Sequence, residues 1–367
     1  MNLLIKIDLK IDSFCASQAK KKNKFEITWP KIYSGITYFT LEEIKTLVQK
    51  NCPDQKCEFV TNRTLQDQAD VVIHRYSTMN LHKESHDGEN QTSVCFNLES
   101  PATDYARGKE GASRHLSDRF HVISSYRLDS DIPSPYGKIR MKKRKVKGSL
   151  ANLRRIIGKK KLKVAWMVSN CQFQPSKRNE LVQELRKYIS VDIFGECGSK
   201  KCSRNRHQMC AQMVSEQYKF YLSLENSICK DYITEKFFFW LPLNVVPVVL
   251  GGGDYRSIAP PKSYIDVTDF DSAKSLAEHL IDLDRNATKY EEYLKWKLNY
   301  DLEVSSYSNY LFCDICRKFT SIKNSRDSMN ITNFPEWYNR FKCYSWGNGL
   351  NRTFLDEVYG YNSKTDS

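Results

Sequence analysis

The sequence lacks any run of apolar residues long enough to cross a membrane. A membrane-spanning helix needs about 20 largely apolar residues, whereas the longest uncharged stretch, residues 237–253, contains two prolines, an asparagine and three glycines. Residues 1–14, "MNLLIKIDLKIDSF", are too short and too charged for a signal-peptide core or a membrane span. We therefore expect a soluble chain, or one whose membrane anchor precedes these residues.

Two glycine-rich phosphate-binding motifs are also missing. No G-x-x-x-x-G-K-[ST] occurs, which excludes a P-loop, and "LGGGDY" at residues 250–255 comes too late in the chain to be the first turn of a dinucleotide-binding fold. We expect these three glycines to form a loop that needs positive φ angles. A phosphate site in this chain would have to use side-chain cations and a helix N-terminus.

Acidic residues are absent from one segment, residues 138–163, which holds 13 Lys and Arg residues. The formal net charge of the chain is +14, so the remainder is close to neutral. We favour a solvated linker; the alternatives are a nuclear-localisation or RNA-binding patch, or attraction to an acidic partner or membrane surface. The segment has no aromatic side chain that could stack on bases, so we expect no nucleic-acid partner.

Cysteine, by contrast, is abundant: the chain has 12 cysteines and also five N-x-S/T sequons. Together they favour an oxidising secretory compartment. Zinc is the alternative for the C-x-x-C at Cys313 and Cys316, but a second ligand pair at the required spacing is missing. Disulfide pairing does not follow from spacing. Cys52 with Cys57, and Cys313 with Cys316, are near enough in sequence to be candidate pairs.

Short apolar runs alternate with helical patterns in both halves of the chain. Strands are expected at residues 69–75, 93–100, 119–127, 163–170, 191–195, 219–226, 245–253 and 262–267. In the second half, a first helix is expected where an apolar stripe runs from Leu181 to Ile189 and includes Tyr188. A second helix is expected over 232–241 with Asp231 as its N-cap, and a third over 272–284. This order predicts an α/β fold with a parallel, doubly wound sheet and a ligand crevice at the carboxyl ends of its strands.

These patterns divide the chain into five parts. We expect a polar leader at residues 1–24, an α/β domain at 25–137, a basic linker at 138–162, a second α/β domain at 163–310 and a cysteine-containing C-terminal tail at 311–367. A length of 367 residues is more than one hydrophobic core usually serves, which agrees with two domains.

Polar side chains gather where the strands of the second domain end and the next helices begin. They are Ser169, Asn170, Arg178, Glu225, Asn226, Tyr232, Glu235 and Lys236. Because carboxyl ends of parallel strands share one edge of a sheet, these side chains should meet at one crevice. Two cations beside a helix N-terminus suit a diphosphate, and a neighbouring carboxylate suits ribose hydroxyls.

One long stretch resembles a known family. "KFYLSLENSICKDYITEKFFFWLPLNVVPVVLGG" (219–252) is similar to the donor-binding signature of the α1,3-fucosyltransferases, glycosyltransferase family 10. "FNLESP" and "YRLDSDIPSPYG" are similar to the acceptor-side block, and "YEEYLKWK" and "CDIC" are similar to the family's end. The resemblance runs from about residue 69 to 316. "DYITEKFF" and "CGSKKCSRNRHQMC" lean toward the invertebrate and plant-type branch, which fucosylates the innermost N-glycan GlcNAc.

The resemblance implies a GT-B fold of two facing Rossmann-like domains and an inverting transfer of L-fucose from GDP-fucose to the 3-hydroxyl of GlcNAc on N-glycans. Arg178 and Lys236 would offset the charge of the leaving diphosphate. Glu235 would bind ribose, and Asn226 and Tyr232 would complete the donor pocket, with Ser169 and Asn170 near the phosphates. Glu99 of "LESP" would be the general base.

Several of these residues have a purely structural alternative. Glu99 could cap the turn before Pro101, Arg178 could lie on an exposed helix face, and Tyr232 could be ordinary packing. Glu225 is expected to serve structure and is not counted among the binding residues. At the level of the protein, the alternatives are a Lewis-type antennal α1,3-fucosyltransferase, a catalytically silent relative that keeps the sugar-nucleotide pocket, and a basic RNA-associated protein.

A metal is not expected to be obligatory. "DSD" at residues 129–131 has the carboxylate spacing of a divalent-cation site. The resemblance, however, implies that positively charged side chains of the protein take the place of the metal. Stimulation of the reaction by a divalent cation would be compatible with that arrangement. The resemblance also implies a type II membrane protein of the Golgi lumen, whose anchor is not part of this sequence, with GDP-fucose and a GlcNAc-containing glycan as its partners.

Overall fold

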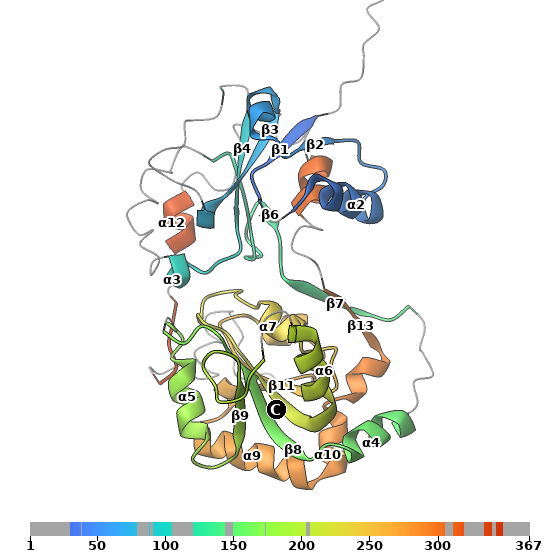
Figure 1. Ribbon diagram of the computed structural model, residues 1–367, viewed down its shortest axis with the longest axis vertical. Helices are drawn as coiled ribbons and strands as arrows, with labels where there is room; N and C mark the ends of the chain where they lie inside the picture. Colours follow the sequence, from blue (N-terminus) through green and yellow to red (C-terminus); the bar gives the residue numbers. More distant parts are fainter. Residues whose placement is uncertain are drawn as a thin grey trace, which may run out of the picture.

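The computed structural model describes both α/β domains and parts of the chain that follows them. The described residues are 30–37, 39–78, 88, 91–104, 120–143, 150–172, 174–202, 206–304, 311–318, 334–339 and 343–347. The leader expected at residues 1–24 lies outside them. Figure 1 shows the first domain above the second, each built around its own sheet.

The first domain contains a six-stranded sheet in which every neighbouring pair is parallel. Its spatial order is β2-β1-β3-β4-β5-β6. The strands are β1 (Lys31–Ser34), β2 (Glu58–Val60), β3 (Val71–Arg75), β4 (Thr92–Asn97), β5 (Val122–Ser125) and β6 (Ile132–Pro133). Every residue of β4 is buried, as expected for a central strand of a parallel sheet covered on both faces.

Short helices connect the strands of the first domain. They are α2 (Leu41–Asn51), η1 (Arg63–Gln68), η2 (Tyr76–Thr78) and α3 (Pro101–Asp104). α2 starts with a capping box, in which the Thr40 hydroxyl accepts from the Glu43 backbone N–H at 3.2 Å and the Glu43 carboxylate accepts from the Thr40 N–H at 2.7 Å. Its buried residues, Ile44 and Val48, join the core of the first sheet.

The second domain contains a five-stranded parallel sheet of order β12-β11-β10-β8-β9. The strands are β8 (Leu162–Met167), β9 (Val191–Phe194), β10 (Tyr218–Leu224), β11 (Val246–Leu250) and β12 (Ile265–Asp266). All five residues of the inner strand β11 are buried. Both domains are thus doubly wound α/β units, as the alternating pattern predicted.

Helices cover both faces of the second sheet (Figure 1). They are α4 (Leu150–Gly158), α5 (Arg178–Leu185), α6 (His207–Gln217), α7 (Glu235–Phe238), α8 (Tyr255–Ile258), η6 (Val267–Asp269), α9 (Ala273–Arg285), α10 (Ala287–Glu292) and η7 (Lys295–Leu298). α9 buries Leu276, Leu280 and Leu283 at helical spacing, and these pack with Leu181 and Leu185 of α5 in one core.

Residues 138–162, expected as a solvated linker, are largely folded. β7 (Gly137–Met141) pairs antiparallel with β13 (Tyr300–Val304), and α4 buries Leu153 and Ile157 in the core of the second domain. Arg154 on the exposed side of α4 donates from Nε to Glu291 of α10 at 2.6 Å. The connection between the domains is therefore a two-stranded ribbon followed by a packed helix.

Residues after 310, expected as a tail, take part in the first domain. Residues 311–318 are helical, and Leu311, Phe312 and Ile315 are buried in the core of the first sheet. This helix is the orange one beside α2 in Figure 1. Further along, α12 (Phe334–Asn339) buries Trp337 and Tyr338 in a cluster of the same domain.

Five disulfides connect described residues, and both candidate pairs proposed from spacing are wrong. Cys52 pairs with Cys313 and Cys57 with Cys316, so the cysteines of the C-x-x-C are bonded to the N-terminal segment. The other pairs are Cys171–Cys197, Cys202–Cys210 and Cys229–Cys343. Spacing failed because the partners are brought together by the chain folding back over more than 250 residues.

Two local predictions in the second domain are also wrong. α7 starts at Glu235 with Thr234 as N-cap, and Asp231, the expected cap, has a φ of 61°. The triple glycine has no positive φ; instead it packs closely, since a Cβ at Gly252 would lie 2.5 Å from the carbonyl oxygen of Cys229. α5 ends at Leu185, earlier than the predicted apolar stripe; of the stripe residues beyond it, Tyr188 is exposed and Ile189 is buried in the same core as Leu181 and Leu185.

Among the helices of the described residues, none combines the length and the apolar character that a membrane crossing requires.

Candidate functional site

One cavity of about 330 Å³ opens at the carboxyl ends of β8 and β10. Its polar lining includes five of the eight residues predicted from the sequence: Ser169, Asn170, Arg178, Glu235 and Lys236. Aromatic side chains, including His207 and Trp240, complete the wall. We call this space the donor-side cavity. The parallel topology places it where the sequence predicted a ligand crevice.

Lys236 is held at the start of α7 by three acceptors. Its Nζ lies 3.2 Å from Glu225 Oε2, 3.0 Å from Glu235 Oε1 and 2.9 Å from Thr234 Oγ1. Burial disfavours the charged form of Lys236, but the attraction of Glu225 and Glu235 outweighs it and raises the pKa of the ammonium group. Lys236 is therefore a fixed cation beside the donor-side cavity.

Glu225 has the structural role that its neighbourhood suggested. Its side chain is fully buried, and it accepts from the backbone N–H of Thr234 at 2.8 Å and from the Thr234 hydroxyl at 2.9 Å. Burial raises the pKa of Glu225, while Lys236 opposes that shift. The carboxylate thereby fixes both the N-cap of α7 and the cation that follows it.

Arg178 is buried, with 4% of its surface exposed, so it is not on an exposed helix face. Its Nη1 donates to the carbonyl of Leu224 at 2.8 Å and its Nε to Gln174 Oε1 at 3.0 Å. Burial lowers the pKa of Arg178, but a guanidinium stays protonated at physiological pH. The second expected cation therefore reaches the donor-side cavity from the first turn of α5.

Glu235 is the exposed member of this group, with 52% of its side chain accessible. Partial removal from water acts to raise the pKa of the Glu235 carboxyl. The ammonium group of Lys236, 3.0 Å away, outweighs this effect, so the pKa of Glu235 is lowered. The group is thus an anion at neutral pH that faces both the cavity and Lys236. It can exchange its ionic partner for a hydroxyl of a bound molecule.

A second cavity of about 360 Å³ lies between the domains, and we call it the acceptor-side cavity. Its lining is Arg75, Ser77, Phe96, Leu98, Glu99, Tyr136 and Glu235. Glu99 follows β4 at its carboxyl end and Arg75 ends β3, so both project from the same edge of the first sheet. Glu235 lines both cavities, which makes it the point where they meet.

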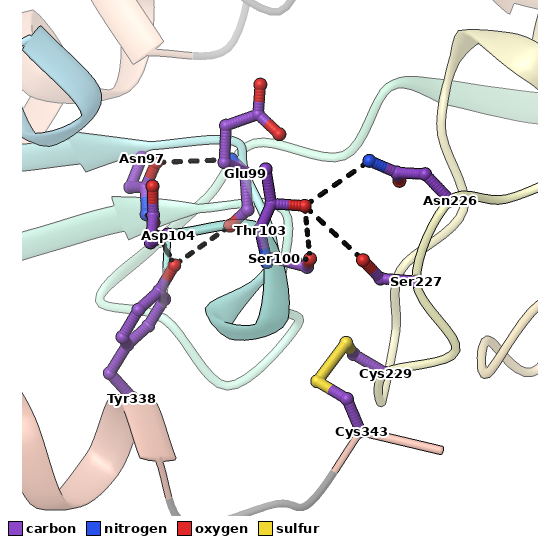
Figure 2. Close-up of a disulfide and its surroundings, with 10 residues drawn as sticks. All are labelled: Asn97, Glu99, Ser100, Thr103, Asp104, Asn226, Ser227, Cys229, Tyr338 and Cys343. Atoms are coloured by element: carbon purple, nitrogen blue, oxygen red, sulfur yellow. Dashed lines mark hydrogen bonds between the residues drawn. A yellow bond between two sulfur atoms is a disulfide. The ribbon is translucent and has the colours of Figure 1, made fainter. Parts of the chain in front are cut away.

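Asn226 and Tyr232 lie at the contact between the domains instead of lining either cavity described above. Asn226 Nδ2 is 3.3 Å from the hydroxyl of Thr103 in α3 of the first domain (Figure 2). Tyr232 is buried against Tyr126, with ring centroids 4.8 Å apart, and burial raises its pKa well above the usual value. Their assignment to a ligand stays a prediction.

The carboxylates of the "DSD" segment are both engaged by protein groups. Asp129 binds the guanidinium of Arg127 at 2.9 and 2.5 Å, and Asp131 accepts from the backbone N–H of Ile123 at 2.8 Å. Over the ranges that the structure describes, no group of three or more His, Cys, Asp and Glu side chains has an arrangement suited to a metal ion.

Sequence reasoning missed several wall residues. Arg75 carried a usable signal, because it ends a strand whose carboxyl edge also carries Glu99. Tyr136 lines the acceptor-side cavity and donates to the carbonyl of Leu98 at 2.8 Å. His207 and Trp240 line the donor-side cavity from α6 and from just after α7. Trp240 follows a run of phenylalanines typical of a core, and His207 lies in a polar stretch beside Arg206, so neither pattern indicated a cavity wall.

Comparison with solved structures defines the class of fold. A crystal structure titled "alpha1,3-Fucosyltransferase with GDP" aligns over 84% of this chain and 94% of its own, with a TM-score of 0.52 at 18% sequence identity. Two facing parallel α/β domains with cavities between and beside them are the GT-B fold of glycosyltransferases. The predicted fold class is confirmed.

The chain belongs to glycosyltransferase family 10, the fucosyltransferases. The model described as "Fucosyltransferase, N-terminal" matches residues 22–137, and "Glycosyltransferase family 10 (fucosyltransferase) C-term" matches residues 157–337. The family inferred from residues 219–252 is therefore confirmed, and the match extends to most of both domains.

Two curated relatives are 34% identical to this chain. "Glycoprotein 3-alpha-L-fucosyltransferase A" of Drosophila melanogaster aligns over 84% of this chain and 59% of its own length. "Alpha-(1,3)-fucosyltransferase fut-1" of Caenorhabditis elegans aligns over 73% of this chain and 61% of its own. The chain thus spans about 60% of the length of these relatives.

Proposed function

We propose that the protein transfers L-fucose from GDP-fucose to the 3-hydroxyl of GlcNAc on N-glycans, with inversion at the sugar carbon. The innermost GlcNAc of the core is the favoured acceptor. The observation that carries this proposal is the meeting of two cavities at Glu235, with the cations Arg178 and Lys236 on one side and the Glu99 carboxylate on the other.

The reaction needs groups of opposite charge on its two sides. The acceptor oxygen attacks the anomeric carbon of fucose as the bond from that carbon to the phosphate oxygen breaks, and GDP leaves with the electron pair. Fixed cations stabilise the charge that grows on the diphosphate, and such groups are worth about 10²–10³ in rate. The proton of the acceptor hydroxyl passes to Glu99, which lines the acceptor-side cavity.

The hydrogen bonds of Lys236 suggest how the donor enters. An ammonium group has three N–H donors, and Glu225, Glu235 and Thr234 each lie within reach of its Nζ. Glu225 is fully buried, whereas Glu235 is half exposed, so Glu235 is the partner that can leave. We propose that a diphosphate oxygen replaces Glu235 on Lys236, and that the released carboxylate binds ribose hydroxyls.

The remaining donor contacts follow from their places in the fold. We propose that Ser169 and Asn170, in the wall of the donor-side cavity, lie near the phosphates, and that Asn226 and Tyr232 support the donor pocket from the domain contact. We propose that no cofactor is obligatory, and that a divalent cation can stimulate the reaction by binding the diphosphate.

The acceptor and the compartment are inferred from different observations. The name "Glycoprotein 3-alpha-L-fucosyltransferase A" of a 34%-identical relative supports a glycoprotein acceptor, whereas Lewis-type antennal transfer is the alternative. Five disulfides favour an oxidising compartment. We propose the Golgi lumen.

Mapping the product tests both the activity and the acceptor. The chain is incubated with GDP-fucose and a panel of core N-glycans and Lewis-type acceptors, and the product linkage is determined by mass spectrometry. Fucose on O3 of the innermost GlcNAc is expected. Transfer only to antennal GlcNAc selects the alternative acceptor. Calorimetric binding of GDP-fucose without any product marks a silent relative.

Glu99→Gln tests the general base. Replacing the carboxylate by an amide removes the proton acceptor but keeps the shape, so the turnover number should fall by about 10²–10⁴. GDP-fucose should bind with unchanged affinity in calorimetry, because Glu99 lies in the acceptor-side cavity. Glu235→Gln is the matched control, and it should weaken donor binding. Full turnover in Glu99→Gln removes Glu99 from this role.

A further inference from the structure

The chain after the second domain runs back across the domain contact. We call its described parts, α12 and residues 343–347, the C-terminal strap. α12 lies beside α3 of the first domain in Figure 1. Residues 343–347 lie on the second domain, since the Tyr344 backbone N–H donates to the Ile228 carbonyl at 2.7 Å and Cys343 is disulfide-bonded to Cys229. The strap therefore contacts both domains.

α12 is held firmly on the first domain. The guanidinium carbon of Arg127 lies 4.1 Å from the centre of the Trp337 ring, and its Nη1 donates to the Trp337 carbonyl at 2.8 Å. Arg127 is only 2% exposed. A buried cation that both stacks on an indole and bonds its main chain leaves little freedom for the helix. The next residue, Tyr338, is fixed in position as a result.

The Tyr338 hydroxyl reaches the turn that carries Glu99 (Figure 2). It lies 3.1 Å from the main-chain carbonyl oxygen of Glu99, 2.5 Å from Asp104 Oδ2 and 2.7 Å from Asn97 Nδ2. Asn97 is the last residue of β4 and Asp104 the last of α3, so one hydroxyl joins the two ends of the turn. Burial raises the pKa of Tyr338 well above the usual value, so the hydroxyl stays a proton donor.

Both main-chain polar groups of Glu99 are bound within this network. Its N–H donates to Asn97 Oδ1 at 3.1 Å, and its carbonyl faces the Tyr338 hydroxyl. Asn97 Nδ2 also donates to Asp104 Oδ2 at 2.8 Å, which closes the network. The Glu99 side chain points away from the network in Figure 2 and lines the acceptor-side cavity. The backbone is thus fixed while the carboxylate faces the cleft.

The opposite side of α3 is tied to the second domain. The Thr103 hydroxyl lies 2.9 Å from the Ser100 hydroxyl and 3.3 Å from the Ser227 hydroxyl. Ser227 is two residues before Cys229, whose disulfide holds the strap. The turn that bears Glu99 is therefore hydrogen-bonded to the strap on one side and to the loop after β10 on the other.

We propose that Tyr338 is a positioning residue for the transfer reaction. By holding the main chain of Glu99, it sets the distance between the Glu99 carboxylate and the acceptor hydroxyl. Tyr338 lies one residue beyond the region that the family models match. The inference rests on the proposed role of Glu99 as the base. A base displaced by about 1 Å can cost about 10²-fold in rate, which is why a residue without substrate contact can matter.

The test compares the hydroxyls of two buried tyrosines. Tyr338→Phe removes the hydroxyl at Glu99, and Tyr290→Phe removes one that donates to the Lys219 carbonyl at 2.6 Å inside the second domain. Both variants should lose thermal stability, Tyr338→Phe the more of the two because its hydroxyl also bonds the Asp104 carboxylate. Only Tyr338→Phe should lower kcat, by about 10-fold to 100-fold, and its KM for GDP-fucose should stay that of the unmodified protein.

A double variant separates this inference from the proposed base. If Tyr338 acts through Glu99, adding Tyr338→Phe to Glu99→Gln should cause no further loss of kcat, because the group it positions is already gone. Equal kcat in Tyr338→Phe and Tyr290→Phe overturns the positioning role. If Glu99→Gln keeps full turnover, the base itself was misassigned. A kcat loss in Tyr338→Phe that is multiplied in the double variant shows that Tyr338 acts by another route.

Discussion

The two cavities are assembled in different ways. The donor-side cavity is built from one stretch of chain, residues 166–240, in which strand ends and helix starts bring the cations and carboxylates together. The acceptor-side cavity depends on groups far apart in sequence: the Glu99 carbonyl lies 3.1 Å from the hydroxyl of Tyr338, 239 residues later, and residues 311–316 complete the core of the first sheet. The donor side is therefore specified locally, whereas the acceptor side needs the end of the chain.

The largest effect is expected from the paired disulfides of the first domain. Replacing Cys52, Cys57, Cys313 and Cys316 by Ser opens a loop of 261 residues and should lower the free energy of unfolding by about 5 kcal/mol. Replacing only Cys52 and Cys313 should cost much less, because Cys57–Cys316 still closes a loop of 259 residues. Denaturant unfolding measures both.

A matched control for those disulfides lies in the second domain. Cys202 and Cys210 are separated by only 8 residues, so replacing both by Ser removes much less loop entropy from the unfolded chain. If the single-pair variant of the first domain loses as much stability as the four-cysteine variant, the remaining Cys57–Cys316 bond contributes nothing by itself and the shared-loop account is wrong.

The next largest effect is expected at Lys236. Lys236→Met removes a fixed cation, so the turnover number should fall by about 10²–10³. The variant also leaves the fully buried Glu225 without its ionic partner, which should cost about 3–5 kcal/mol of stability. Steady-state kinetics with GDP-fucose and thermal unfolding of the same preparation give the two values.

The double variant Lys236→Met with Glu225→Gln distinguishes the two roles of Lys236. The Gln carbonyl can still accept from the Thr234 N–H that Glu225 binds at 2.8 Å, so stability should largely return. Activity should not return, because the cation beside the donor-side cavity is still missing. Recovery of turnover together with stability would mean that Lys236 serves only the fold.

The smallest effect is expected at the domain contact. Asn226→Ala should weaken GDP-fucose binding about fivefold if the amide supports the donor, since one hydrogen bond is worth about 1 kcal/mol. Thr103→Val is the control, because it removes the 3.3 Å contact with Asn226 but keeps the amide. Calorimetry on both variants decides the point: equal affinities would make Asn226 a residue of the domain contact alone.

The donor side could be read from the sequence because parallel strands force their carboxyl ends to one edge. Arg178, Glu235 and Lys236 needed only the order of strands and helices to be placed in one cavity. The N-cap of α7 was misread, since Asp231 and Thr234 are both good caps by type. The buried carboxylate of Glu225 selects Thr234, and that contact is invisible before the fold is known.

The rest of the acceptor side could not be predicted, for a physical reason. The support of Glu99 by Tyr338 and the pairing of Cys52 with Cys313 are contacts between distant segments, and sequence periodicity reports only local structure. The glycines at 251–253 gave a misleading signal because close packing and positive φ both favour glycine. The order of strands and helices in the sequence was therefore enough to predict where the donor-side cavity lies. The residues that line the cavities depend on side-chain packing, which the sequence pattern does not report.

The burial of residues 311–316 in the first domain has a consequence for biosynthesis. The core of the first sheet and its two disulfides are complete only after the second domain has been translated, since 261 residues separate Cys52 from Cys313. At about 5–20 residues per second this interval lasts roughly 10–50 s. During that time Cys52 and Cys57 of the nascent first domain have no partner thiols from residues 313 and 316, and the apolar face that residues 311–316 later cover stays open.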